Sequence, residues 1–514
     1  MGLAGCPASI DPYSTMGMVD IFVIDQVAEG LFTIDVTTNN SEIIYNLATH
    51  HEWNDNATEL TCVLRKKVKF HDGTPFNAAA VKWNFDRIYR LIDNLTYPER
   101  WLFPDGRPII NETQIIDDYT VKFVLNAPYV PLRNLMASRG HILSPAATPS
   151  DEFINVYTGK LVGTGPFIYN NYEYEVNLSL SANPYYWGGK PDIDKLIFYQ
   201  IDNIPNQIEA LLSGDIDIFR WPLFNETILN EFRDNSSFIV QEGLLPFVTS
   251  FEINNKLINA TMRKAISYAL NYSALFKPYE NLGKVVRSKS PIPEVVLYHN
   301  ITGIKVPYYN ISIARQVLKD TGWPGTANLT VNDNISAYNE WEMVAKGLTP
   351  LATYNYDFVL DWGLNHTYQF IEDLKQIGVK IEYNEMSLAE YYWCGFELYG
   401  YNKDMLTIAW YGWMGDFNDP INFINPFFSS KADGHSNFGQ FNDTLVQQWM
   451  EEAIRKTNPT ARERLYYKIQ KRLIEELYPQ IWELSPVRAD VYASDLRNYY
   501  FNSFKLEFKS VSFI

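Results

Sequence analysis

Residues 193–219 read as a strand, an amphipathic helix and a second strand in succession. The segment "IDKLIFYQID" (193–202) is rich in β-branched and aromatic residues, and "IPNQIEALLSG" (204–214) has helical spacing and ends on Gly214. The following "DIDIF" (215–219) predicts a short buried strand. A strand–helix–strand unit needs a sheet with helices packed on it, so this segment limits the fold to the mixed α/β class.

Strand and helix patterns alternate along the rest of the chain. Residues 59–76 predict a strand and a loop that turns at Asp72-Gly73, and 77–92 predict a helix that begins at Asn77. Strands are also expected at 119–128 and at 404–412, which is too apolar for an exposed face and therefore lies mid-sheet. The other helix patterns cover 260–271, 312–322, the first half of 367–386, 443–456 and 461–479. At 514 residues we expect about three domains, in at least two lobes.

The charge balance excludes two classes of partner. The formal net charge is -17 and no basic run is present, which argues against nucleic acid and anionic membranes. No run of about 18 apolar residues predicts a membrane-spanning helix. Cys6, Cys62 and Cys394 lie far apart without metal-ligand spacing, so no zinc site is expected and at most one disulfide is possible. The sequence "LAGC" ending at Cys6 is similar to a lipoprotein cleavage box, but no apolar stretch precedes it.

The asparagines carry a signal about the compartment. The acceptor pattern Asn-X-Ser/Thr for N-linked glycans is abundant, and chance would give about a third as many sites. An Asn-rich chain from a cell that never glycosylates would also show it. We favour a heavily glycosylated protein exposed outside the cell, with each modified asparagine on the surface. The candidate sites are Asn39, Asn56, Asn94, Asn111, Asn177, Asn225, Asn235, Asn259, Asn271, Asn300, Asn310, Asn328, Asn334, Asn365 and Asn442.

Signatures of catalysis are missing from the sequence. It contains no GxSxG, no P-loop, no HExxH and no GxGxxG after a strand. The histidines are dispersed: His50 and His51 would point in opposite directions in a strand, and His71 and His435 lie in glycine-containing loops. A carboxylate pair for glycoside hydrolysis stays open, because 60 acidic residues supply many candidates. We predict no metal site, no cofactor and no enzymatic activity.

Residues 409–428, "AWYGWMGDFNDPINFINPFF", are almost all aromatic, glycine or apolar, yet they carry Asp416 and Asp419. A buried carboxylate is costly unless a positive partner meets it. That partner could be internal to the protein, a metal ion or an incoming ligand. Asp419 precedes Pro420, so a turn and cap role is expected for it. For Asp416, an internal salt bridge or helix cap stays open beside a ligand-binding role.

A set of motifs runs nearly from end to end of the chain. They are "PASIDPY" (7–13), "VAEGLFTID" (27–35), "LRKKVKFHDGTPFNAAAVKWNFDRI" (64–88), "VGTGPFIY" (162–169), "NPYYWGGKPDIDKLIF" (183–198), "IEALLSGDIDI" (208–218), "MRKAISYALN" (262–271), "ARQVLKDTGW" (314–323), "LKQIGVKIE" (374–382) and "YGWMGDFNDPINFINPFFSS" (411–430). In this order they resemble the oligopeptide/dipeptide-binding family of ABC-transporter solute-binding proteins, family 5.

Two departures from the family pattern stand out. Ala79-Ala80 replace a usual acidic residue, which should affect only the start of a helix. The chain also begins without the strand that usually precedes "PASIDPY", so we expect a native N-terminus and its anchor to be missing.

The resemblance implies a two-lobed, periplasmic-binding-protein-like (type II) α/β fold with an extra inserted α+β domain. Lobe I would consist of residues 1–36, 160–245 and 485–514. The inserted domain would span 37–159, and lobe II would span 246–484. A hinge between the lobes would close around the ligand.

The resemblance also implies a binding site. In peptide binders of this family, the aspartate after the Gly-Trp pair meets the α-ammonium of the peptide, and Asp416 matches that position. Its charge would then be neutralised by the ligand and not by the protein. Backbone groups of Gly412, Trp413 and Met414 would pair with the peptide as an added strand. Trp410, Trp413 and Phe417 are candidates to line the cleft, with core packing as the alternative.

The function implied is that of an extracellular receptor that captures oligopeptides or dipeptides and delivers them to an ABC permease. The same scaffold could instead bind oligosaccharides by stacking on aromatic side chains, since 15% of the residues are aromatic. Nickel-chelate or haem binding, known among relatives, gains little from seven dispersed histidines. A secreted hydrolase is the remaining alternative. We expect a monomer at the cell surface, anchored through a segment absent from this chain.

Overall fold

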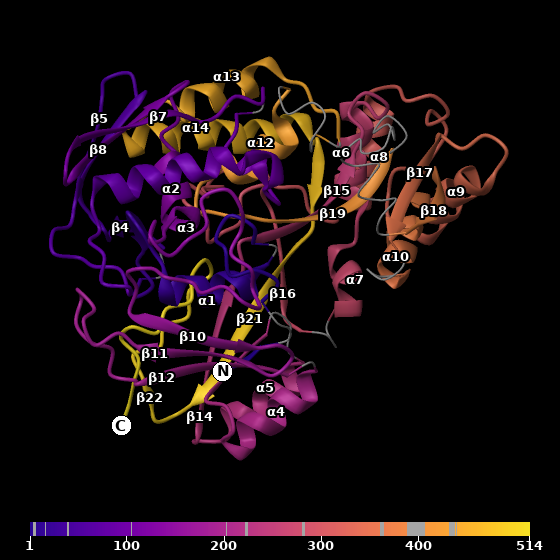
Figure 1. Cartoon of the computed structure of the whole chain (residues 1–514). Coiled ribbons are helices and arrows are strands. Elements are labelled where there is room, and N and C mark those ends of the chain that lie inside the picture. The colour runs from indigo at the N-terminus through magenta and orange to yellow at the C-terminus, as the bar shows by residue number, and fades with distance from the viewer. Residues whose placement is uncertain are drawn as a thin grey trace.

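The computed structural model describes residues 1–3, 7–15, 17–38, 41–103, 105–201, 203–221, 225–279, 283–359, 364–387, 407–430, 437 and 439–514. In these residues the chain is a mixed α/β protein built around three main sheets, as expected (Figure 1). Among the candidate residues, Cys6, Asn39, Cys394 and His435 lie outside the described residues.

The largest sheet has eight strands and draws on the beginning, the middle and the end of the chain. In spatial order its strands are β10 (Phe167–Glu173), β11 (Asn177–Ala182), β12 (Lys195–Gln200), β1 (Gly2–Leu3), β13 (Ile218–Trp221), β21 (Leu484–Ala493) and β14 (Phe238–Leu244), with β16 (Val285–Arg287) on β21. Helix α4 (Ile204–Ser213) connects β12 to β13 and ends at Gly214, whose φ of 82° suits glycine. The predicted strand–helix–strand unit is therefore present.

Strand β1 corrects one expectation. Gly2 and Leu3 pair in parallel with Tyr199 and Gln200 of β12, and Gly2 also pairs with Phe219 of β13. A short strand therefore does precede "PASIDPY". Two residues are too few to form a periodic pattern from which the strand could be predicted.

The second sheet has five strands, in the order β18 (Val379–Met386), β17 (Ala352–Val359), β19 (Ile408–Met414), β15 (Phe247–Ile253) and β20 (Gln480–Trp482). The apolar strand β19 lies in the middle, as its composition predicted. The helices of this part of the chain are α6 (Ala260–Ala269), α7 (Tyr272–Phe276), α8 (Ile311–Asp320), α9 (Ile335–Lys346) and α10 (Leu364–Lys375). Their apolar faces and the sheet share a core that includes Phe251, Trp341 and Phe370.

The third sheet has four strands, in the order β5 (Ala48–Trp53), β6 (Glu59–Leu64), β8 (Thr120–Leu125) and β7 (Ile110–Asp117). It is accompanied by α2 (Ala78–Arg90) and α3 (Leu132–Arg139). Asn77 begins α2 as predicted, because its side chain accepts a hydrogen bond of 3.0 Å from the Ala80 N–H. These elements lie in the range expected for the inserted domain. The domain boundaries themselves stay a prediction.

Helices α12 (Ile421–Phe428), α13 (Thr444–Ala453) and α14 (Pro459–Lys471) pack beside the four-stranded sheet, at the top of Figure 1. Ile424, Met450 and Ile469 belong to the same hydrophobic core as Phe85 and Phe123. The Val130 N–H donates to the Ile454 carbonyl over 2.8 Å. Segments expected in lobe II and in the inserted domain are therefore joined by a continuous apolar interface.

The remaining elements are shorter or peripheral. They are α1 (Met18–Val27), α5 (Glu226–Arg233), the pairs β2 (Glu29–Gly30) with β9 (His141–Ile142), β3 (Phe32–Ile34) with β4 (Ile43–Tyr45) and β22 (Leu496–Arg497) with β23 (Ser512–Phe513), the 3-10 turns η1 (Ile92–Asn94), η2 (Pro98–Arg100) and η3 (Lys277–Tyr279), and the π-helical turn η7 (Arg472–Leu477). Within the described residues, no helix has the length and apolar character needed to cross a membrane.

Candidate functional site

Strand β19 leads to the candidate site and has one partly unpaired edge. It pairs with β15 along its whole length, from Ile253↔Ile408 to Phe247↔Met414. On the other edge, β17 pairs only with Ile408 and Ala409. In the part of the chain that the structure describes, no strand pairs with residues 412–414 on that second edge. The edge is therefore suited to an added strand.

Two glycines around the end of β19 allow close packing. A Cβ on Gly412 would lie 2.5 Å from Cζ of Phe247, and one on Gly415 would lie 2.2 Å from Cζ of Phe423. A side chain at either position would displace an aromatic ring. The two glycines therefore let these aromatic rings pack directly against the backbone near the end of β19.

The carboxylate of Asp416 is paired with two arginines. It accepts hydrogen bonds from Arg100 Nε (2.9 Å) and Nη2 (2.6 Å) and from Arg139 Nη2 (2.9 Å). The backbone N–H of Asp416 donates to Asn422 Oδ1 over 3.0 Å. The internal salt bridge that the sequence left open for Asp416 is therefore present, and neutralisation of this charge by a ligand stays a prediction. No local pattern predicts this pairing, because both arginines are far from Asp416 along the chain.

The two guanidinium groups keep Asp416 ionised. Burial by itself would raise the pKa of Asp416, but the charges of Arg100 and Arg139 outweigh it and hold the pKa below its ordinary value. Burial lowers the pKa of Arg139, and the neighbouring Asp416 opposes that change. With two cations around one carboxylate, the cluster has a net positive charge.

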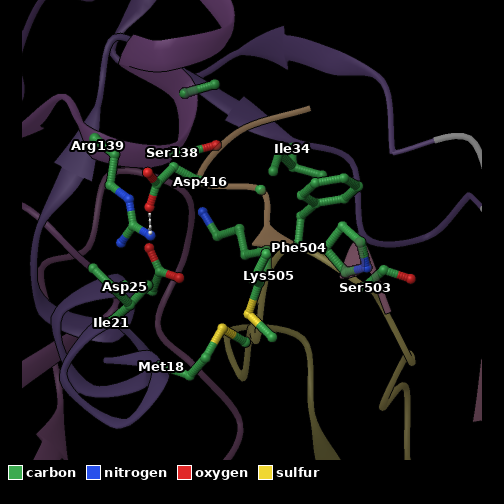
Figure 2. A pocket seen from close by; sticks show the side chains of 14 residues that line it. Met18, Ile21, Asp25, Ile34, Ser138, Arg139, Asp416, Ser503, Phe504 and Lys505 are labelled. Carbon is green, nitrogen blue, oxygen red and sulfur yellow. Dashed lines mark hydrogen bonds and ion pairs between the residues drawn. The ribbon is translucent and has the colours of Figure 1, made fainter. Parts of the chain in front are cut away.

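Asp416 also lines a pocket between segments that are distant in the sequence (Figure 2). The lining comes from α1, β3, the end of α3, the end of β19 with the turn after it, the residue before β15 and the C-terminal segment. The residues are Met18, Ile21, Asp25, Ile34, Ala137, Ser138, Arg139, Pro246, Met414, Gly415, Asp416, Ser503, Phe504 and Lys505. The cavity measures about 20 Å³, enough for a water molecule and too small for a peptide.

Some polar groups at this pocket lack a hydrogen-bond partner in the described chain, and others are already paired. Ser138 Oγ and Arg139 Nε are buried and have no hydrogen-bond partner among the described residues. Asp25 Oδ1 lies 2.9 Å from Nε2 of His141, and Lys505 Nζ donates to Thr33 Oγ1. Buried donors without partners are costly, so Ser138 and Arg139 favour an incoming acceptor.

The aromatic candidates lie elsewhere. Trp410 Nε1 donates to Glu483 Oε2 over 2.6 Å, and Trp413 Nε1 donates to the Asn422 carbonyl over 2.9 Å. Phe417 is 3% exposed and belongs to a core cluster. Of the residues predicted to contact a ligand, Met414 and Asp416 line the pocket, and Trp410, Trp413 and Phe417 do not. The residues that the sequence did not single out are Arg100, Arg139, Ser138 and Lys505.

Asp419 forms the turn expected from its position before Pro420, because its Oδ1 accepts from the Ile421 N–H over 3.1 Å, but Pro420 itself is the N-cap of α12. It is also fully buried and paired with Arg462 Nη2 at 2.8 Å. Tyr466 OH and Asn134 Nδ2 complete its hydrogen bonds. Asp419 therefore holds the base of the loop that carries Asp416.

The other candidate residues have local roles. His51 Nδ1 lies 2.9 Å from Tyr45 OH, and His71 Nε2 lies 2.9 Å from the Gly165 carbonyl. Cys62 is buried with a free thiol. No cluster of three potential metal ligands occurs among the described residues.

Comparison with known proteins identifies the family. The model of "Bacterial extracellular solute-binding proteins, family 5 Middle" matches residues 42–435. The chain is 26% identical over 486 residues to the probable D,D-dipeptide-binding periplasmic protein DdpA of Escherichia coli, covering 93% of this chain and 86% of that protein. It is 25% identical over 462 residues to heme-binding protein A of Haemophilus influenzae, covering 85% and 78%.

A solved structure gives the fold. The structure of HbpA2 from Haemophilus parasuis has a TM-score of 0.82 and 21% identity, and the match covers 100% of this chain and 99% of that one. The predicted fold of the periplasmic binding proteins is thereby confirmed. Family members are periplasmic or extracellular receptors for transport and are not enzymes. The family model matches most of the chain, which shows that the chain belongs to the bacterial extracellular solute-binding proteins of family 5.

Proposed function

We propose that the chain is the receptor of an ABC importer that captures short peptides in the cleft beside Asp416 and delivers them to a membrane permease. The observation that carries this proposal is that Asp416 and Arg139 line one pocket, while Arg100 pairs with the same carboxylate. A carboxylate and a guanidinium group at one pocket, with a second guanidinium group paired to the carboxylate, provide partners for both charged ends of a peptide.

The charges suit a zwitterionic ligand. An α-ammonium group would bind Asp416, and a carboxylate would bind the arginines that Asp416 releases. One internal cluster is then exchanged for two ion pairs with the ligand, so no buried charge loses its partner. A charge-assisted hydrogen bond of this kind contributes about 1.5–3 kcal/mol. Ser138 Oγ and Arg139 Nε, which have no partner in the described chain, could meet further acceptor atoms of the ligand.

The backbone of β19 would supply affinity without side-chain selection. Residues 412–414 are paired with β15 on one edge and lack a described strand on the other. An extended peptide could add to that edge as a short strand. This mode would accept many side chains, and the ion pairs would set the direction of the peptide.

Uptake would require the cleft to open. The pocket of about 20 Å³ is too small for a peptide, and Arg100 and Arg139 connect the expected inserted domain to Asp416 of expected lobe II. Opening would separate the two guanidinium groups from the Asp416 carboxylate. On closure, the charged ends of the ligand would bind to these groups. Closure around a ligand gives a permease two distinguishable forms of the receptor.

Binding of oligosaccharides has less support. Stacking needs exposed aromatic faces, whereas Trp410 and Trp413 use their indole N–H groups in internal hydrogen bonds and Phe417 is buried. We place the protein outside the cytoplasm because the family has that location. Anchoring through a segment outside this chain and a monomeric state stay expectations.

Isothermal titration calorimetry can test the proposal with trialanine, N-acetyl-trialanine, trialanine amide and cellotriose. We expect trialanine to bind with a micromolar or lower Kd, and each blocked peptide to bind at least tenfold more weakly. Tight binding of cellotriose without binding of any peptide would reject the peptide assignment. Native mass spectrometry of the purified protein would add the mass of any ligand that co-purifies.

A further inference from the structure

The asparagines of the Asn-X-Ser/Thr sites lie at the surface. Apart from Asn39 and Asn365, whose side chains are not described, none of them is buried. The exposed ones are Asn56, Asn94, Asn111, Asn235, Asn259, Asn328, Asn334 and Asn442. The half-buried ones are Asn177, Asn225, Asn271, Asn300 and Asn310. Exposure is what attachment of a glycan requires.

Three of these asparagines begin helices of eight residues or more in the same geometry. Asn259, Asn310 and Asn334 are the N-caps of α6, α8 and α9. Their Oδ1 atoms accept from the N–H groups three residues later over 3.1, 3.0 and 2.9 Å. Their Nδ2 atoms have no partner among the described residues. The cap therefore fixes the amide carbonyl and leaves the amide nitrogen unpaired at the surface.

Other asparagines show the opposite arrangement. Asn84, Asn134 and Asn418 are buried, lie outside the acceptor pattern, and donate Nδ2 to carbonyl oxygens inside the protein. An Nδ2 that is tied in this way cannot be modified without loss of a buried hydrogen bond. At Asn259, Asn310 and Asn334 the amide nitrogen is not tied in this way.

Helix capping alone does not explain the pattern. A cap needs the side-chain oxygen of the asparagine and makes no demand for a hydroxyl two residues later. Asn77 and Asn203 cap helices without Ser or Thr at that position, and Asn458 is followed by a proline, which excludes an acceptor site. At Asn259, Asn310 and Asn334 the hydroxyl is present in Thr261, Ser312 and Ser336.

We propose that Asn259, Asn310 and Asn334 carry N-linked oligosaccharides. The proposal rests on the extracellular location given under the proposed function. The donor would be an oligosaccharide linked through phosphate to a lipid, used by a membrane transferase. Asparagine Nδ2 attacks the anomeric carbon, a C–N bond forms, and the C–O bond to phosphate breaks with its electron pair leaving on the phosphate. Nδ2 gives one proton to a base of the transferase.

The modified side chain keeps its structural role. The amide carbonyl is retained in the product, so Oδ1 continues to cap the helix. In Figure 1, α6, α8 and α9 belong to the right-hand part of the molecule, built on the five-stranded sheet. None of the three asparagines lines the pocket beside Asp416. Glycans at these positions would shield the helix ends and leave ligand binding unaffected.

The experiment is glycopeptide mass spectrometry on the full chain secreted by its own cells. Peptides containing Asn259, Asn310 or Asn334 should carry additional masses spaced by sugar units. The variants Asn259→Asp, Asn310→Asp and Asn334→Asp should each lose the addition at that site while keeping the cap and the melting temperature. Thr261→Ala, Ser312→Ala and Ser336→Ala should abolish the addition while the asparagine remains.

Recovery of all three peptides unmodified would overturn the inference. Trialanine titration of the same sample separates this outcome from a failure of the proposed function. A protein that binds peptide without sugar rejects only the glycans, and a glycosylated protein that binds no peptide rejects only the receptor assignment. Additions that persist in the alanine variants would also contradict attachment at these sites.

Discussion

Arg100 and Asp416 lie 316 positions apart in the chain, and their side chains form a two-point ion pair over 2.9 and 2.6 Å. Arg100 ends the 3-10 turn η2, whereas Asp416 follows the central strand of the five-stranded sheet. The pair therefore connects two parts of the molecule that a bound ligand would have to separate.

Replacing Arg139 by alanine should distinguish the two ends of a peptide ligand. Arg139→Ala removes a partner for the carboxylate and leaves Asp416 available to the ammonium. Affinity for trialanine should fall at least tenfold, whereas affinity for trialanine amide should not fall. Calorimetric titration of both peptides measures the difference. Equal losses for the two peptides would contradict a carboxylate contact at Arg139.

Asp416→Asn tests the contact with the ammonium group. The substitution preserves shape and removes the charge, so trialanine should bind at least tenfold more weakly. The two arginines lose an ionised partner, and the free energy of unfolding should fall by about 1–3 kcal/mol. Asp194→Asn is the matched control, because Asp194 is 83% exposed and pairs only with Lys190 in the described chain. Unchanged peptide affinity in Asp416→Asn would reject the role given to this residue.

The buried pair of Asp419 and Arg462 should be a major determinant of stability. Arg462→Met leaves the fully buried carboxylate of Asp419 without its cation. The free energy of unfolding in urea should fall by about 3–5 kcal/mol. Arg107→Met offers a comparison at an exposed ion pair and should leave the urea midpoint unchanged. Similar urea midpoints for both variants would show that the buried ion pair contributes no more to stability than the exposed one.

Glu252 should make stability depend on pH. It is 3% exposed, and burial raises its pKa from 4.5 to about 7, while Ser250 and Gln480 oppose the shift. Between these pH values the folded protein holds a proton that the unfolded chain has lost, so the free energy of unfolding falls as pH rises. Glu252→Gln binds no proton there, and its stability should fall less steeply from pH 4.5 to 7.

Urea titrations at several pH values would measure the two slopes. Burial also raises the pKa of Asp357 to about 6 and of Asp373 to about 7, so part of the slope should remain in the variant. Glu382→Gln, at a carboxylate whose side chain is 55% exposed, serves as the control. Parallel slopes for wild type and Glu252→Gln would contradict the assignment.

Local patterns in the sequence predicted most of the elements. Asn77 and Gly214 mark the start and end of helices because capping depends on neighbouring residues. Strand β19 was expected mid-sheet because its composition leaves no polar face. Strand β1 escaped prediction because two residues carry no periodicity and its pairing depends on β12 and β13.

The candidate site was predicted only in part. The family motif singled out Asp416, which lines a pocket in the structure, and its contact with a ligand stays a prediction. Its partners Arg100 and Arg139 come from distant segments, and no local spacing connects them to Asp416. Trp410 and Trp413 illustrate the opposite problem, since aromatic residues near a site have the same sequence signature whether they face a ligand or a core.

The apolar interface between α12–α14 and the four-stranded sheet has a thermal consequence. Any opening that exposes Ile424 or Met450 to water would raise the heat capacity of the ligand-free protein. The enthalpy of ligand binding would then become more negative with increasing temperature, in proportion to the apolar surface that closure removes from water.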